Sequence, residues 1–140
     1  TIEWAGVHTG VLFGEYNYGQ GLGFKLRGIP LIIGVNWLIL CLASRAIFKK
    51  FFSSPWLISI FSSILMCILD FLIEPIAIKF DFWHWKNNII PIQNYVMWFI
   101  SSLMLQMIIQ KSDIKLAFKP GLTVFLVQIA FFVVLNFFIL

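Results

Sequence analysis

The chain has 140 residues, of which 61% are hydrophobic and 11% are charged, and its formal net charge is +4. A soluble domain averages about 25% charged residues, so this composition excludes an ordinary soluble domain and indicates an integral membrane protein. The ten basic residues are scattered along the sequence without a dense basic run, which argues against nucleic acid as a partner.

Five apolar segments follow one another along the chain. A helix that spans a membrane needs about 20 mostly apolar residues. The first segment is shorter and resembles the second half of a span, so we expect the chain to be a fragment that lacks upstream helices. In chain order the predicted spans are residues 1–13, 29–48, 56–78, 91–110 and 120–140.

These segments are predicted to be helices, because backbone polar groups in lipid must be satisfied within the segment itself. The predicted fold is all-α: a polytopic transmembrane helix bundle with four full spans and one partial N-terminal span, forming a single membrane-embedded domain over residues 1–140. Four of the five prolines stand at the starts of spans, where the missing N–H costs nothing. Pro75 lies inside a span instead and is predicted to kink or end that helix near Glu74.

The connecting loops alternate between the two faces of the membrane. Loops 14–28 and 79–90 are predicted to share one face, where they carry four basic residues. Loops 45–55 and 111–119 are predicted to share the other face, where they carry six. Cytoplasmic loops are enriched in Lys and Arg, so the second face is predicted to be cytoplasmic.

Two carboxylates interrupt the third predicted span, within the stretch DFLIEPIAIKFDFWHW at residues 70–85. Asp70 and Glu74 are four residues apart, so they lie on one face of the helix. A charged side chain at the centre of a membrane helix costs about 2.5 to 3.5 kcal/mol on insertion scales, so such a pair needs a partner, a hydrated cavity or a task. At about 1.5 Å per residue, Glu3 and His8 of the first segment are predicted to lie at similar depths, roughly 6 to 15 Å from the same face.

Each of these polar residues also has a purely structural explanation. Asp70 and Glu74 can pair with a Lys or Arg of an absent helix, and Glu3 can cap or pair within the bundle. His8 and His84 have the alternative of being satisfied hydrogen-bonding groups rather than catalysts. The tryptophans on either side of His84 are equally typical of anchors at the membrane interface.

Aromatic and hydrogen-bonding side chains are concentrated in the two loops on the face nearest these carboxylates. Residues 14–28 read GEYNYGQGLGFKLRG, and residues 79–88 read KFDFWHWKNN. The second and fourth spans add amides and an indole near the same face. The predicted substrate-binding side chains are therefore His8, Tyr16, Tyr18, Asn36, Trp37, Trp83, Trp85 and Asn94.

At these residues the sequence resembles the carotenoid biosynthesis family of polytopic membrane proteins, which includes bacterial γ-carotene 1′-hydroxylases and haloarchaeal bisanhydrobacterioruberin hydratases. The order and spacing of four stretches fit that family and cover nearly the whole chain, while family members are longer at the N-terminal side. The resemblance implies a carotenoid or other isoprenoid lipid substrate and a multi-pass protein of a bacterial or archaeal cell membrane. The matching stretches are EWAGVHTGVLFGEYNYG (3–19), GIPLIIGVNWLIL (28–40), DFLIEPIAIKFDFWHW (70–85) and IPIQNYVMWF (90–99).

The resemblance implies the addition of water across the terminal C1=C2 double bond of an acyclic carotenoid, which gives a tertiary alcohol. That reaction needs an acid that protonates C2, a stabilised cation at C1, and a base that takes a proton from water. A carboxylic acid in low-dielectric surroundings keeps its proton and becomes a usable acid, and desolvated aromatic faces stabilise a cation by about 2 kcal/mol. We assign the acid to Asp70 and the base to Glu74, with Glu3 or His84 as alternatives for the base.

No metal or other cofactor is expected, because hydration needs none and two histidines cannot form the His clusters of a di-iron hydroxylase. Three other functions fit parts of the pattern. The spacing of Asp70 and Glu74 resembles half of the acidic signature with which membrane prenyltransferases hold Mg²⁺ and a diphosphate. Buried carboxylates also suit the proton relay of a proton-coupled transporter. The third alternative is a carotenoid-binding membrane protein without catalytic activity.

Overall fold

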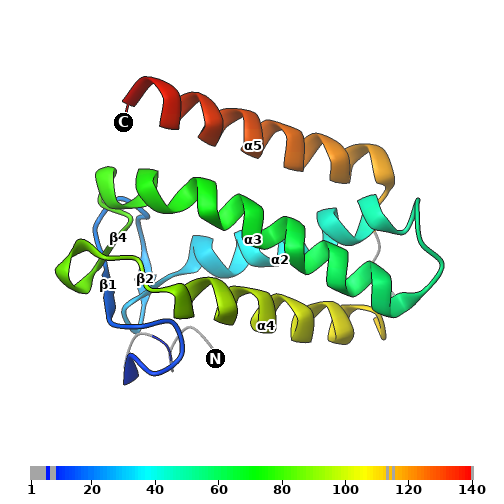
Figure 1. Ribbon diagram of the computed structural model, residues 1–140, viewed down its shortest axis with the longest axis horizontal. Helices are drawn as coiled ribbons and strands as arrows, with labels where there is room; N and C mark the ends of the chain where they lie inside the picture. Colours follow the sequence, from blue (N-terminus) through cyan, green and yellow to red (C-terminus); the bar gives the residue numbers. More distant parts are fainter. Residues whose placement is uncertain (1–5, 7–8, 113, 115, 140) are drawn as a thin grey trace.

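The computed structural model describes residues 6, 9–112, 114 and 116–139, and four long helices dominate it (Figure 1). Each of the four is long and apolar enough to cross a membrane, which confirms the predicted transmembrane helix bundle. Their ends lie within two residues of the predicted spans. The helices are α2 (Leu31–Phe48), α3 (Pro55–Lys79), α4 (Ile92–Ile109) and α5 (Phe118–Ile139).

Helix α3 lies at the centre of the bundle and packs against the other three helices, with α4 and α5 on opposite sides of it (Figure 1). Small side chains are common where helices pack together in membranes. Five serines of α3 and α4 are at most 3% exposed: Ser59, Ser62 and Ser63 on α3, and Ser101 and Ser102 on α4.

Helix α5 meets α2 at Gly121. A Cβ atom there would lie 2.9 Å from the carbonyl oxygen of Ala43 and 3.0 Å from the Cβ of Ala46. The missing side chain therefore sets the distance between the two helices, because a larger residue would push their backbones apart.

Pro75 is predicted to kink or end α3 near Glu74, and the second of these outcomes is wrong, because the helix continues for five residues beyond Glu74 to Lys79. Proline in a membrane helix is tolerated where a neighbouring helix supplies hydrogen bonds to the carbonyls of the preceding turn. Asn136 on α5 donates a 2.8 Å hydrogen bond from Nδ2 to the carbonyl of Leu72, which lies in the turn before Pro75.

The first predicted span lies largely outside the described residues. Within the described part, residues 10–13 form a bend and a turn, so the prediction that a helix continues to residue 13 is wrong. Gly10 adopts a positive φ of 64°, a conformation that ends a helix and that glycine adopts readily.

Two short strand pairs lie at the end of the bundle where α3 ends (Figure 1). Strand β1 (Tyr16–Tyr18) pairs antiparallel with β4 (Trp83–Trp85), and β2 (Lys25–Leu26) pairs with β3 (Ile29–Pro30). A 3₁₀ turn, Lys86–Asn88, follows β4. The first pairing joins the loops 14–28 and 79–90, so these loops share one face as predicted.

The close approach at Gly121 predicts that Gly121→Leu lowers the free energy of unfolding by about 1 to 3 kcal/mol, because overpacking forces α5 away from α2. Unfolding of the purified protein by SDS titration measures the change. The control is Gly34→Ala, because a Cβ at position 34 meets no atom within 4 Å and alanine favours a helix. A Gly121→Leu protein that unfolds at the wild-type SDS fraction would contradict this account of the α2–α5 contact.

Candidate active site

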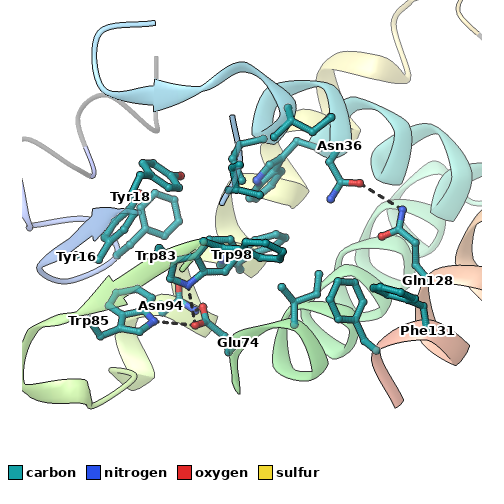
Figure 2. A pocket seen from close by; sticks show the side chains of 18 residues that line it. Tyr16, Tyr18, Asn36, Glu74, Trp83, Trp85, Asn94, Trp98, Gln128 and Phe131 are labelled. Carbon is teal, nitrogen blue, oxygen red and sulfur yellow. Dashed lines mark hydrogen bonds between the residues drawn. The ribbon is translucent and has the colours of Figure 1, made fainter. Parts of the chain in front are cut away.

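The carboxylate of Glu74 is the centre of a buried hydrogen-bond network (Figure 2). Its side chain is on the last turns of α3, and the residue is only 1% exposed. One oxygen, Oε2, accepts hydrogen bonds from the indole Nε1 of Trp83 at 3.0 Å and of Trp85 at 2.7 Å. The other oxygen, Oε1, accepts a 2.8 Å hydrogen bond from Nδ2 of Asn94. Neutral donors therefore satisfy this carboxylate.

Asn94 connects Glu74 to the second buried carboxylate. Its Nδ2 also donates to Oδ2 of Asp70 at 3.1 Å, and both Asn94 and Asp70 are at most 2% exposed. Asp70 and Glu74 thus face the same residue at the beginning of α4, as expected for two residues one helical turn apart. A single amide group holds the two carboxyl groups in one cluster.

The pairing of β1 with β4 positions the indoles of Trp83 and Trp85. Alternate residues of a strand point to the same side, so these two rings lie on one face of the ribbon. The register places Tyr16 opposite Trp85 and Tyr18 opposite Trp83, with ring centroids 5.0 Å and 6.3 Å apart. Four aromatic rings therefore cover the end of α3 above Glu74.

His84 lies on the opposite face of the same ribbon and points away from Glu74. Its side chain is about half exposed, and its Nε2 is 2.6 Å from Oδ1 of Asp81. Strand alternation is the physical reason, because a residue between two inward-pointing tryptophans must point outward. The structure therefore does not bring this predicted catalytic candidate to the carboxylate cluster.

A cavity of about 320 Å³ opens beside Glu74, between the aromatic ribbon and the four helices (Figure 2). Asp70 does not line this cavity, because it lies one helical turn before Glu74 on α3. Glu3 and His8 lie outside the described residues. Eight of the predicted site residues line the cavity: Tyr16, Tyr18, Asn36, Trp37, Glu74, Trp83, Trp85 and Asn94.

Comparison with known proteins shows the family of this membrane-helix chain. A family model described as "Carotenoid biosynthesis protein" matches residues 1–140. The chain belongs to this family. It is 28% identical over 113 residues to a bisanhydrobacterioruberin hydratase from Haloarcula japonica, in a match that covers 71% of this chain. The match covers 37% of the length of that relative. No solved structure matches the chain significantly.

Several residues that line the cavity of this carotenoid biosynthesis protein are not among the predicted site residues. The ring of Trp98 stacks on Trp37 with centroids 4.2 Å apart, and Nε2 of Gln128 on α5 donates to Oδ1 of Asn36 at 3.3 Å. Trp98 follows Asn94 by four residues, so helical spacing already places both on one face. An amide inside a very apolar span, such as Gln128, is itself a signal of a functional or packing role.

The turn at Asp81 fixes the ribbon to the end of α3. Oδ2 of Asp81 accepts a 2.7 Å hydrogen bond from the backbone N–H of Gln20. The main-chain carbonyl of Asp81 accepts a second, 2.9 Å hydrogen bond from the N–H of Gly21. The hydrogen bond from His84, and next that from Gln20, hold the pKa of Asp81 below its ordinary value. Asp81 therefore stays charged at neutral pH. A Cβ at Gly19 would collide with this carboxylate, so the turn requires glycine there.

Side-chain hydrogen bonds connect the two carboxyl groups of the cluster with neutral donors. Among the described residues, no group of three His, Cys, Asp or Glu side chains is placed to hold a metal ion. Two carboxyl groups linked by an amide, with two indole donors, form a buried hydrogen-bonded network whose strength depends on every member being satisfied.

The network predicts that Trp85→Phe destabilises this carotenoid biosynthesis protein by about 1 to 3 kcal/mol, because a buried carboxylate loses its shortest donor while the ring is largely kept. SDS titration of the purified protein gives the difference in unfolding free energy. Trp56→Phe is the matched control, since Trp56 is 60% exposed at the beginning of α3. Equal stability of the two variants would mean that the indole N–H does not support Glu74.

Proposed function

We propose that this protein is a carotenoid-modifying enzyme that adds water, without a cofactor, across the terminal C1=C2 double bond of an acyclic carotenoid. The observation that carries the proposal is the Glu74 carboxyl group, which is buried, held by three neutral donors and adjacent to a cavity walled by aromatic rings. Membership of the carotenoid biosynthesis family and the name of the haloarchaeal relative support the same reaction class.

The carboxyl cluster is suited to holding one proton ready for transfer. Glu74 and Asp70 accept hydrogen bonds from the same nitrogen atom, so their charges would lie close together in low-dielectric surroundings. Like charges at such a distance cannot both form without a large cost, so the pair retains a proton. Of the two, Glu74 lines the cavity and is the group that can reach a substrate.

The reaction then needs a single carboxyl group that acts twice. Protonated Glu74 transfers its proton to C2, and the π electrons of the double bond form the new C–H bond and leave a tertiary cation at C1. The oxygen of a water molecule bonds to C1, and one of its protons passes to the Glu74 carboxylate. Alkene and water thus give a tertiary alcohol, and Glu74 returns to its protonated form.

The aromatic walls supply the stabilisation that a tertiary cation requires. Trp83 and Trp85 donate their N–H groups to Glu74, so their rings are held beside the reacting carboxyl group. Tyr16 and Tyr18 pack against these rings from β1. Desolvated aromatic faces stabilise a cation by about 2 kcal/mol.

This assignment differs from the division of roles predicted from the sequence. There the deeper Asp70 was the acid and Glu74 the base. Because Glu74 lines the cavity and Asp70 does not, we assign both proton transfers to Glu74. Asp70 becomes the charged partner that keeps the proton on Glu74. Glu3 stays a candidate outside the described residues, and His84 is not part of the proposed site.

Expression in a lycopene-producing bacterial host tests the proposal. In unlabelled water the expected product is 18 daltons heavier per hydrated end. In H₂¹⁸O the new oxygen of the product is expected to carry the label. Label from ¹⁸O₂ would contradict hydration. Unchanged lycopene that copurifies with the protein would favour a carotenoid-binding role, and a requirement for Mg²⁺ and a prenyl diphosphate would favour a prenyltransferase.

In the same host, Glu74→Gln is expected to lower the rate of product formation by about 10² to 10⁴, because the amide cannot donate an acidic proton. Asp70→Asn is also expected to abolish most of the product. The matched control is Glu15→Gln, whose carboxylate is exposed and pairs with Lys86 on the surface. Wild-type yields from both site variants, at equal protein levels in the membrane, would remove the two carboxyl groups from the mechanism.

A further inference from the structure

Two amide side chains form a separate polar group in the wall of the cavity beside Glu74. Asn36 on α2 and Gln128 on α5 both line that cavity, and both are half-buried. Nε2 of Gln128 donates a 3.3 Å hydrogen bond to Oδ1 of Asn36. Figure 2 shows this pair on the side of the cavity away from Glu74, outside the network of the two carboxyl groups.

The hydrogen bond between the two amides uses only part of their hydrogen-bonding capacity. An N–H donor of Asn36 and the carbonyl oxygen of Gln128 have no partner among the residues that the structure describes. Both groups point toward the interior of the cavity (Figure 2). Turning the two amides over together exchanges their roles and still leaves one donor and one acceptor. Polar groups in low-dielectric surroundings are costly without a partner, so this wall suits a ligand that satisfies both groups.

The other lining residues select the kind of polar group that the pair can bind. Most of them are aromatic or aliphatic, and none of the described residues that line the cavity is Lys or Arg. A carboxylate or a phosphate would therefore lie without a counter-charge in the same cavity as Glu74. A hydroxyl group carries no charge and both donates and accepts, so it can use the two free amide groups at once, whereas a ketone or ether oxygen only accepts.

We propose that Asn36 and Gln128 bind a hydroxyl group of the isoprenoid whose terminal double bond lies at Glu74. This inference rests on the proposed function, because it adds a second attachment point for the same substrate. The N–H of Asn36 donates to the hydroxyl oxygen, and the hydroxyl group donates its hydrogen to the carbonyl oxygen of Gln128. The preferred substrate is therefore an acyclic isoprenoid alcohol, which the amides hold so that its double bond lies at the acid.

Ligand pairs that differ only in the hydroxyl group test this inference. Geraniol and farnesol both carry the required terminal double bond, and each is compared with the hydrocarbon of the same skeleton. Binding to the protein in lipid nanodiscs is measured by tryptophan fluorescence, with affinity expressed per mole fraction of ligand in the lipid. For at least one pair the alcohol is expected to bind about tenfold more tightly, which is the effect of two neutral hydrogen bonds. The reporting tryptophans line the cavity: Trp37, Trp83, Trp85 and Trp98.

Substitution of either amide is expected to remove the preference for the alcohol. Gln128→Met keeps most of the side-chain length without the amide, and Asn36→Leu does the same on α2, so in both variants the preference is expected to fall to about twofold or less. Affinity for the hydrocarbon is expected to stay unchanged, which checks that the cavity is intact. The matched control is Asn136→Leu, because Asn136 is another amide of α5 that lies outside the cavity and donates to backbone carbonyls.

Both halves of the experiment can overturn the inference without any turnover. Equal binding of alcohol and hydrocarbon by the wild-type protein, in both ligand pairs, would overturn it and indicate that water occupies the two amides. A preference that persists in both Gln128→Met and Asn36→Leu would also overturn it, because the hydroxyl group would then bind elsewhere. Absence of hydration of every ligand, with the binding preference intact, would instead contradict the proposed function and leave the hydroxyl site standing.

Discussion

A carboxylate buried in a membrane helix must be satisfied by the protein, and this requirement organises the strand end of the bundle. Glu74 obtains two indole donors from β4 and one amide donor from the beginning of α4. Each donor depends on a different part of the chain: β4 must turn back onto α3, and α4 must begin beside it. The hydrogen bonds of one side chain therefore connect two helices and the aromatic ribbon.

The same arrangement gives the site its chemical character. Indole and amide donors carry no charge, so they stabilise a negatively charged carboxylate less than the full positive charge of a lysine or arginine would. The rings that carry the indole donors also wall the cavity, which places aromatic rings near the carboxyl group. Structural support and the proposed catalysis thus depend on the same residues, Trp83 and Trp85.

Much of the fold could be predicted from the sequence, because apolar length dictates membrane helices and helical spacing places Asp70 and Glu74 on one face. The three-residue strands could not be predicted, since their pairing depends on contacts between residues about 67 positions apart. That pairing decides which way each loop residue points, so it places Trp83 and Trp85 at the cavity and His84 outside. The hydrogen bond from Asn136 to the carbonyl of Leu72 likewise forms only once α5 is packed against α3.

The central claim is that Glu74 is the carboxyl group that holds the transferable proton beside the substrate. Infrared difference spectroscopy of the protein in lipid nanodiscs, with and without lycopene, measures this through the carbonyl stretch of a protonated carboxyl group. The account predicts a carboxyl band that shifts when lycopene binds and that disappears in Glu74→Gln. A lycopene-sensitive band that persists unchanged in Glu74→Gln would contradict the account and assign the proton to another group.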